Sequence, residues 1–359
     1  MQVCAGMMLA FSCAFSLSLA EKYPVYSYVF AEFDVDESYI YDSDFESFAR
    51  KHEAQIKRFY THSLQRGEEL VPMVQGYLID DGLSDLFIYL SMVESGFSPE
   101  VVSPKKAAGL WQFMPATAKS YKLDIHSSFD ERFDPVSSTF AAINYLNTLY
   151  VQFGKWYLAA IAYNCGEGRL QKAIREAGSD ELSILLSERE KYLPAETRDY
   201  IKKILLMAMI GESSNMDVGP AVPEAGDRLF QVEVAPGAKL KDIAALIEMD
   251  PSELMHMNRQ FKTGIVPKEK ASYKIMIPEE KMMRFYLRYE FPEVKKRIKP
   301  YLLSHYVKLG ETMEIIAKNY HTTVEEIREA NRFQDDFLAV GTLLVIPVEK
   351  KIFDSALKR

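Results

Sequence analysis

Residues 83–96 read Leu-Ser-Asp-Leu-Phe-Ile-Tyr-Leu-Ser-Met-Val-Glu-Ser-Gly, and this stretch decides how the first two thirds of the chain are interpreted. Its apolar residues recur at helical spacing, at positions 83, 86, 87, 90 and 93. Glu94 follows Phe87 by seven residues and Leu90 by four, so a helix places it on the apolar face. Gly96 is typical of the residue that ends a helix. We therefore expect a helix whose last turn carries an inward-facing carboxylate.

The expected position of Glu94 has a chemical consequence. A carboxylate at the end of a buried stripe is partly desolvated, which raises its pKa. A general acid that works near neutral pH needs such a raised pKa. The simpler alternative is a glutamate at a frayed helix end that reaches solvent. For an isolated glutamate this alternative is the more common case, so the neighbouring motifs have to decide.

Three further motifs follow Glu94 in the sequence. Residues 109–115 read GLWQFMP, in which Gly109 allows close backbone approach and Gln112 offers an amide donor and acceptor. Residues 162–168 read AYNCGEG, which resembles a helix end followed by turn glycines. Residues 193–200 read LPAETRDY, and the four-residue spacing of its Glu and Tyr places both on one helix face. Each motif alone is weak, because aromatic residues at helical spacing usually belong to a core.

The sequence around these motifs predicts an α-rich domain over residues 66–215, with helices joined by short loops and no convincing strand pairs. Asp134 and Pro135 are typical of an N-cap and a first helical residue, and they predict a helix that continues through Tyr150. Further helices are expected over 156–163 and 197–210, and one before them over 45–63. Residues 32–46 hold seven acids and neither Lys nor Arg, which predicts a solvated, irregular segment.

The C-terminal part contains an internal repeat. Residues 230–278 resemble residues 305–347, with paired Val, Gly, Ala and Asn residues offset by 73 positions. The closing prolines, Pro278 and Pro347, are offset by only 69, so the first copy holds four extra residues before its last strand. Each copy is predicted to form a strand, a turn at Gly, two short helices and a second strand.

The remaining boundaries follow from composition. We expect an N-terminal acidic and helical region over 21–65, a Gly- and Pro-rich linker over 216–229, a helical connector over 279–304, and a tail over 348–359. The connector carries the basic run Lys295-Lys296-Arg297. Contact with nucleic acid or anionic lipid is one interpretation of this run, and a solvated face is the preferred one.

Residues 1–20 are uncharged and end in a small-x-small pattern, Ser18-Leu19-Ala20. This pattern predicts a secretory signal peptide cleaved after Ala20, although the usual basic n-region is missing. A retained membrane anchor and a buried N-terminal helix are the alternatives. After cleavage Cys165 would be the one remaining cysteine of three, so no intramolecular disulfide is expected.

The composition is that of a globular protein with a net charge of -8, which disfavours a general nucleic-acid binder. The six histidines are scattered and form no HExxH or Cys/His pair, so neither a metal nor another cofactor is expected. His305 and His321 are expected at the surface. No GxSxG motif or phosphate-binding glycine loop is present.

Taken in order, the motifs resemble those of the lysozyme-like lytic transglycosylases, across roughly residues 70–210. The match covers Glu94-Ser95, Ser103, residues 109–114, Ala162 to Asn164, and residues 193–200. The repeat resembles LysM modules, which bind glycans that contain N-acetylglucosamine. The copy at 305–347 matches closely, whereas the copy at 230–278 is degenerate. The resemblance implies an α-rich (α+β lysozyme-like) catalytic domain followed by two small βααβ LysM modules.

The resemblance also implies roles for single residues. Glu94 would protonate the glycosidic oxygen and then act as a base on the 6-hydroxyl group of the sugar, leaving a 1,6-anhydro end. Ser103 would bind the N-acetyl group, and Tyr200 would position or polarise Glu94, with Ser95 and Glu196 in support. The sugar subsites would be lined by Gln112, Met114, Tyr163 and Asn164. For Ser95, a backbone-bonding role at the helix end is an equally good interpretation.

The substrate implied is the glycan strand of peptidoglycan, in the periplasm or cell envelope, with membrane association through the N-terminus as an option. A single carboxylate suffices for such a reaction, whereas ordinary glycosidases need two. Asp124, Asp134 and Glu167 are other acids in this region, so a two-carboxylate scheme stays open. The alternatives are a goose-type muramidase and a catalytically inactive peptidoglycan-binding scaffold. Oligomeric state and endo or exo cleavage are not indicated.

Overall fold

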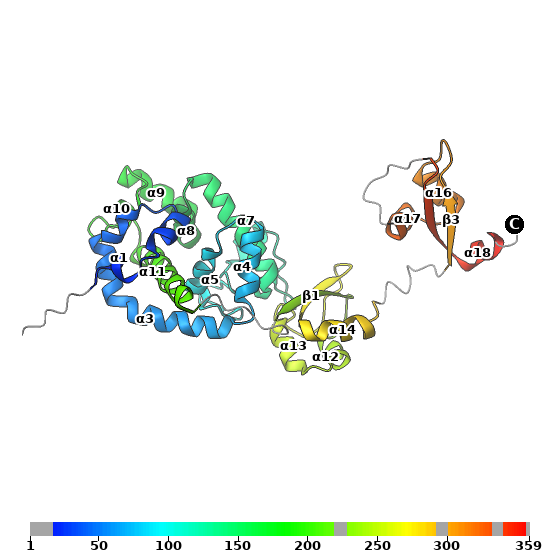
Figure 1. The fold of residues 1–359 in the computed structure, drawn as a ribbon, viewed down its shortest axis with the longest axis horizontal. Coiled ribbons are helices and arrows are strands. Elements are labelled where there is room, and N and C mark those ends of the chain that lie inside the picture. Colours follow the sequence, from blue (N-terminus) through cyan, green and yellow to red (C-terminus); the bar gives the residue numbers. More distant parts are fainter. Residues whose placement is uncertain (1–16, 219–227, 292–300, 332–339, 357–359) are drawn as a thin grey trace, which may run out of the picture.

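The structure is a computed structural model that describes residues 17–218, 228–291, 301–331 and 340–356. It consists of a helical unit followed by two small modules, each built on a two-stranded sheet (Figure 1). The α-rich architecture and the βααβ modules are therefore as predicted from the sequence.

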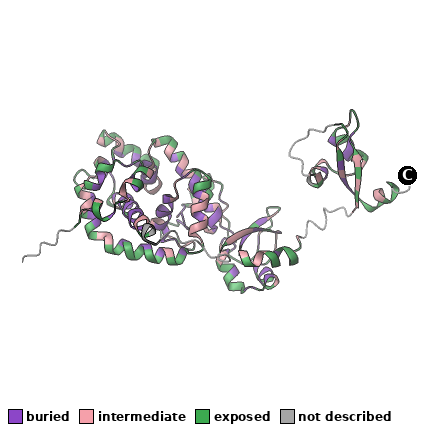
Figure 2. Cartoon of the chain, viewed as in Figure 1, coloured by how far each residue is buried: buried purple, intermediate pink, exposed green. Residues whose placement is uncertain are grey.

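The helical unit is formed by helices of very different length around a common apolar core (Figure 2). Its elements are α1 (Leu19–Lys22), α2 (Tyr26–Glu32), η1 (Glu37–Tyr41), α3 (Ser43–Gly67), α4 (Val71–Asp80), η2 (Asp85–Phe87), α5 (Ile88–Ser95), α6 (Pro115–Ser120), η3 (Glu131–Phe133), α7 (Pro135–Phe153), α8 (Trp156–Cys165), α9 (Glu167–Ala177), α10 (Leu182–Leu185) and α11 (Ala195–Val218). The long helix α11 packs against α3, α5 and α8. The strand contacts within this unit are isolated bridges.

Local sequence signals explain where two of these helices begin and end. Helix α5 ends at Ser95 because Gly96 adopts a left-handed conformation, with φ of 62°, and its N–H donates to the carbonyl of Met92. Helix α7 starts after Asp134, whose carboxylate accepts hydrogen bonds from two backbone N–H groups of the first turn. It runs to Phe153, three residues beyond the expected end.

The prediction of a solvated, irregular segment over residues 32–46 is wrong. Phe33, Tyr39, Ile40 and Phe45 are buried in the main core, and the acids between them occupy the surface. The Asp36 and Asp42 carboxylates cap η1 and α3. The acidic residues thus cap helices or face outward, while the apolar residues between them pack into the core. Residues 21–65 consequently share one core with residues 66–215.

The predicted signal peptide lies mostly outside the described residues. The expected cleavage site after Ala20 falls inside α1, where Ser18 and Glu21 form a capping box and Leu19 is buried. The predicted 216–229 linker and the Lys295–Arg297 run are also largely or wholly outside the described residues, and α11 extends to Val218. In the described part of the chain, no helix is long and apolar enough to cross a membrane.

Both modules have the predicted order of elements and an antiparallel strand pair. The first is formed by β1 (Leu229–Val234), α12 (Leu240–Ile247), α13 (Pro251–Met257), β2 (Tyr273–Pro278) and α14 (Glu279–Arg288). The second is formed by β3 (Tyr301–Tyr306), α16 (Met313–Asn319), α17 (Val324–Asn331), β4 (Leu343–Val348) and α18 (Lys350–Ala356). Each has its own apolar core.

One asparagine joins the end of the second helix to the second strand in each module. The Asn258 side chain donates to the Met276 carbonyl at 2.8 Å and accepts from the Met276 N–H at 2.7 Å. Asn331 makes the same pair of hydrogen bonds with Val345. A side-chain amide that bonds a strand on both its donor and its acceptor holds the strand register. The two asparagines lie 73 positions apart in the sequence, and each makes the same contact with the second strand of its own module.

His305 differs from the prediction that it is a simple surface residue. Its side chain is largely buried between two partners, with Nδ1 3.0 Å from the Tyr320 hydroxyl and Nε2 2.7 Å from the Glu311 carboxylate. The imidazole therefore joins β3 to the turn and helix that follow it.

Candidate active site

The site is centred on Glu94, in the last turn of α5. Its Oε1 atom accepts a hydrogen bond of 2.7 Å from the hydroxyl group of Tyr200, which is buried on α11. Glu94 and Tyr200 are 106 residues apart in the sequence, and they meet because α11 packs directly against α5. Glu94 itself is only partly exposed. The carboxylate thus faces the protein, as predicted, and keeps some access to solvent.

The electrostatic environment of Glu94 suits a general acid. Desolvation raises its pKa to about 7, opposed by the Tyr200 hydrogen bond and assisted by the negative charge of Glu196. The pKa of Tyr200 lies well above its usual value, because the phenol is buried beside Glu94. Tyr200 therefore remains a hydrogen-bond donor at physiological pH. The acid is protonated below about pH 7 and can deliver that proton.

Tyr163, on α8, belongs to the same cluster. Its hydroxyl group donates a 2.7 Å hydrogen bond to the carbonyl of Trp111, which fixes the ring against the loop after α5. Burial and the charge of Glu94 hold the Tyr163 pKa well above its usual range. Trp111 is fully buried and donates from Nε1 to Thr139 at 2.9 Å. Trp111 of the GLWQFMP motif is thus a core residue, and its backbone carbonyl positions Tyr163.

Two tyrosines that the sequence motifs did not indicate, Tyr145 and Tyr121, extend this cluster. The Tyr145 ring lies 5.1 Å from the Tyr163 ring and 4.9 Å from the Tyr121 ring, and all three residues are partly exposed. The buried Phe113 ring lies 6.1 Å from the Tyr163 ring. A row of partly exposed aromatic rings beside an acid is a surface on which sugar rings can stack. Helical spacing alone could not separate Tyr145 from an ordinary core position of α7.

Ser103 and Gln112 lie in one compact loop, residues 101–113. The Ser103 hydroxyl oxygen accepts from the Ala107 N–H at 3.0 Å. The Gln112 amide donates to the carbonyls of Val101 and Gly109 at 3.0 and 2.9 Å. These bonds hold the loop together and leave the Ser103 O–H and the Gln112 side-chain carbonyl as groups that could meet a ligand.

Gly109 is required where this loop meets η3. Its φ is 81°, and an added Cβ would lie 1.7 Å from the carbonyl oxygen of Arg132, a backbone atom. We expect Gly109→Ala to lower unfolding free energy by about 2–4 kcal/mol and to lower activity with it. Thermal unfolding of the two proteins tests this.

Gly76→Ala is the matched control. Gly76 lies inside α4, and a Cβ added there would meet no other atom within 4 Å. Alanine there should raise stability by about 0.5–1 kcal/mol, because it is the better helix former. Equal and small effects at both positions would contradict the close approach at Gly109.

The other predicted site residues occupy less central positions. Ser95 is buried and its hydroxyl donates to the Ser91 carbonyl at 3.1 Å, which agrees with the backbone-bonding interpretation. Glu196 is exposed and acts on Glu94 through its charge. Asn164 is partly exposed next to Tyr163, and Met114 is exposed at the start of α6.

Cys165 packs only partly, and desolvation raises the pKa of its thiol to about 11.

The other acids considered as a second carboxylate are committed elsewhere. Asp134 caps α7, Asp124 pairs with Lys270 at 2.6 Å, and Glu167 is exposed in the first turn of α9. Among the described residues, no group of three or more His, Cys, Asp or Glu side chains is placed to hold a metal ion. Of the acids considered, only Glu94 lies among the buried phenols; Glu196 is close enough to act on it through its charge but is exposed.

Three parts of the chain match known families. Residues 80–185 match the family described as transglycosylase SLT domain. Residues 228–291 match the lytic transglycosylase MltD, LysM-like domain, and residues 305–347 match the LysM domain.

Individual relatives point the same way. Membrane-bound lytic murein transglycosylase D of Escherichia coli K12 is 27% identical over 304 residues, which are 80% of this chain and 65% of that protein. The chain thus spans just under two thirds of that relative's length. The soluble lytic murein transglycosylase of the same organism is 32% identical over 117 residues, 31% of this chain and 18% of that protein.

Similar solved structures include lytic transglycosylase Slt from Pseudomonas aeruginosa, at 23% identity and a TM-score of 0.34, over 40% of this chain and 24% of that one. The soluble lytic transglycosylase of Escherichia coli is similar at 25% identity and a TM-score of 0.33, over 41% of this chain and 24% of that one.

Proposed function

Because the chain carries a transglycosylase SLT domain ahead of two LysM-type modules, we propose that it is a peptidoglycan lytic transglycosylase, which cleaves the bond between N-acetylmuramic acid and N-acetylglucosamine without water. The observation that carries the proposal is the inward-facing carboxyl group of the partly exposed residue Glu94, with its pKa raised to about 7 and a hydrogen bond from Tyr200. A hydrolase of the ordinary kind would need a second carboxylate across the bond.

In the proposed reaction the Glu94 carboxyl group acts twice. Protonated Glu94 donates its proton to the glycosidic oxygen as the bond breaks, and the resulting carboxylate takes the proton of the muramic acid 6-hydroxyl. That oxygen closes on the anomeric carbon, so no water is consumed and a 1,6-anhydro end is left. Tyr200 holds the Glu94 oxygen in place, which supports the use of one group as acid and then base.

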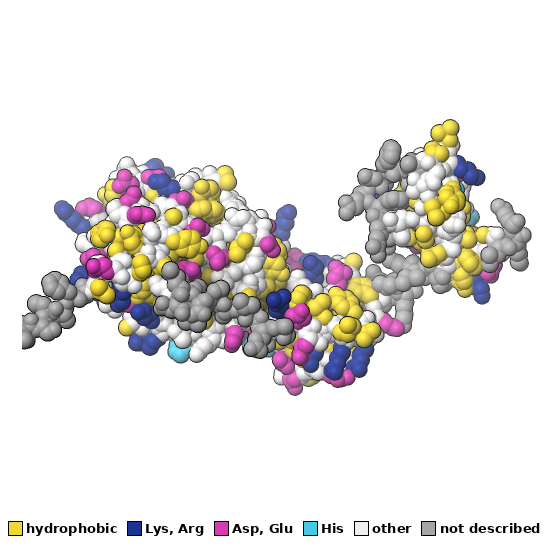
Figure 3. All heavy atoms as spheres, viewed as in Figure 1, with side chains coloured by type: hydrophobic (Ala, Val, Ile, Leu, Met, Phe, Trp, Pro, Cys, Tyr) yellow, Lys and Arg dark blue, Asp and Glu magenta, His cyan; other side chains and the backbone are white. Residues whose placement is uncertain are grey.

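The substrate-binding proposal rests on the surroundings of Glu94. The rings of Tyr163, Tyr145 and Tyr121 supply a stacking surface, and the loop that carries Ser103 and Gln112 supplies polar groups. Charged side chains of both signs are interspersed over the face drawn in Figure 3. The proposed recognition is by stacking and hydrogen bonds rather than by bulk charge. Such a substrate places the protein outside the cytoplasm, at the cell envelope, with membrane association as a further part of the proposal.

The decisive experiment is mass analysis of fragments released from purified sacculi. The proposal predicts muropeptides with 1,6-anhydro ends, lighter by one water than hydrolytic products. Fragments with reducing ends would instead identify a muramidase. No released fragments from a folded preparation that still binds sacculi would favour a binding scaffold.

The second module offers a separate prediction about tethering. Its core is self-contained, so a chain that ends at residue 291 should fold without it. We expect this truncated chain to cleave soluble glycan fragments at the full-length rate but to bind sacculi about 10- to 100-fold more weakly, because one of two linked binding units is lost. Co-sedimentation with sacculi measures the change, and undiminished binding would remove the tethering role.

A further inference from the structure

The first module is packed onto the helical unit through the segment between α13 and β2. The ring of Phe261 lies 5.1 Å from that of Phe129, and Tyr273 meets Phe129 edge-on at 5.3 Å. Phe129 precedes η3 in the helical unit, yet it is buried in the apolar core of the module. The extra residues that distinguish this copy from the second fall within 258–272, which supplies this contact. The four extra residues of the first copy thus fall in the segment that docks on the helical unit.

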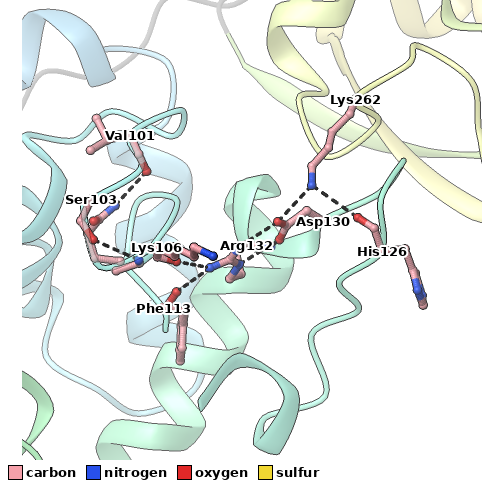
Figure 4. Close-up of polar contacts among 10 residues, drawn as sticks. Val101, Ser103, Lys106, Phe113, His126, Asp130, Arg132 and Lys262 are labelled. Atoms are coloured by element: carbon pink, nitrogen blue, oxygen red, sulfur yellow. Dashed lines mark hydrogen bonds and ion pairs between the residues drawn. The ribbon is translucent and has the colours of Figure 1, made fainter. Parts of the chain in front are cut away.

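Backbone and charged groups continue the contact. The Asp130 N–H donates to the Gln260 carbonyl and the Lys262 N–H donates to the Ser128 carbonyl, both at 3.0 Å. The Lys262 ammonium reaches the Asp130 Oδ2 atom at 3.4 Å and the His126 carbonyl at 3.4 Å (Figure 4). A lysine of the module therefore contacts a buried carboxylate of the helical unit.

That carboxylate belongs to a buried ion pair. Asp130 is 1% exposed and Arg132 is 7% exposed, and their side chains are joined at 2.9 and 3.0 Å. The Arg132 guanidinium also donates from Nη1 to the carbonyls of Lys106 and Phe113, at 2.7 and 3.0 Å (Figure 4). Both carbonyls lie in the loop of residues 101–113. One guanidinium therefore joins the module-facing carboxylate to the loop.

The two carbonyls that Arg132 bonds belong to the turns within the loop. Lys106 closes the turn that begins at Ser103, and Phe113 pairs with Ala108 through two backbone hydrogen bonds. A buried guanidinium is held strongly by its carboxylate partner, because loss of that partner would leave an uncompensated buried charge. Lys262 meets the same Oδ2 atom that Arg132 Nη2 bonds. The Lys262 ammonium therefore offsets the negative charge of Asp130 from the side opposite the loop.

We propose that Lys262 is a positioning residue of the active site, acting through Asp130 and Arg132 on the loop that carries Ser103 and Gln112. The first module is then a structural part of the active site as well as a wall-binding element. The inference rests on the proposed function for its effect on turnover, but the effect on the loop itself is independent of any activity.

The test compares full-length Lys262→Met with the wild-type protein in two measurements. Hydrogen–deuterium exchange of backbone amides in residues 101–113 should become about tenfold faster, because the loop loses its fixed guanidinium. Turnover of soluble glycan fragments should fall about three- to tenfold, since small displacements of binding groups are costly to catalysis. Sedimentation with sacculi should not change, and Lys262→Arg should restore both measurements.

Lys270→Met is the matched control in the same interface. Lys270 pairs with Asp124 and Glu131 rather than with the buried Asp130–Arg132 pair, and the groups are partly exposed, so little loss is expected. Unchanged exchange and turnover in Lys262→Met would overturn the proposal, as would an equal loss in Lys270→Met. Absence of 1,6-anhydro products from the wild type would instead reject the proposed function, and the exchange measurement would still decide the role of Lys262.

Discussion

Replacing Glu94 by glutamine should lower the turnover of glycan strands by about 10³-fold while the protein stays folded. Glutamine keeps the size of the side chain and can accept the Tyr200 hydrogen bond, but it can neither donate the proton nor take it back. The measurement is the yield of 1,6-anhydro ends from sacculi over time. Glu176→Gln, on the exposed face of α9, is the matched control and should retain wild-type turnover.

The same substitution should make the protein more stable at alkaline pH. The folded pKa of Glu94 is raised from 4.5 to about 7, so burial disfavours the charged form. The destabilisation is absent below about pH 4.5, grows between 4.5 and 7, and is complete above about pH 7. Glu94→Gln should therefore raise the free energy of unfolding at pH 8 by on the order of 2 kcal/mol, allowing for the solvent access of Glu94.

Urea denaturation at pH 8 and pH 5 tests the sign. The gain should be present at pH 8 and largely lost at pH 5, where Glu94 is protonated in the folded protein. Equal stability of both proteins at pH 8, together with wild-type turnover, would remove Glu94 from the catalytic role.

Tyr200→Phe should reduce turnover by about 10²-fold and also change its pH dependence. In the wild type, activity should fall as pH rises through about 7, because Glu94 loses the proton that it must donate. The Tyr200 hydrogen bond lowers the pKa of Glu94, so its removal should shift this fall to higher pH. A lower turnover rate together with a shifted pH profile is the result expected only of a residue that bonds Glu94.

Tyr157→Phe is the control for this prediction. Tyr157 is also buried, and its hydroxyl donates to the Asp180 carbonyl at 2.9 Å, away from Glu94. Its loss should affect stability and leave the pH profile of turnover unchanged. If both variants keep the wild-type pH profile, the hydrogen bond between Tyr200 and Glu94 has no part in setting the pKa of Glu94.

Capping residues and periodicity predicted much of the fold because they act within one or two turns. Gly96 ends α5, Asp134 begins α7, and the repeated asparagines mark equivalent strand contacts in the two modules. The prediction for the acidic segment over residues 32–46 is wrong for a related reason. Charge counts do not distinguish acids that cap helices from acids that keep a segment in solvent.

The sequence by itself determined the inward face of Glu94, the order of the site motifs and the duplicated modules, because helical period and offset repeats are properties of the chain. Only the tertiary structure decided that Tyr200 meets Glu94 across 106 residues, that Tyr145 joins the aromatic cluster, and that Lys262 reaches the Asp130–Arg132 pair. These contacts depend on how α5, α7, α11 and the first module pack together. Side-chain packing between distant segments leaves no periodic trace in a single sequence.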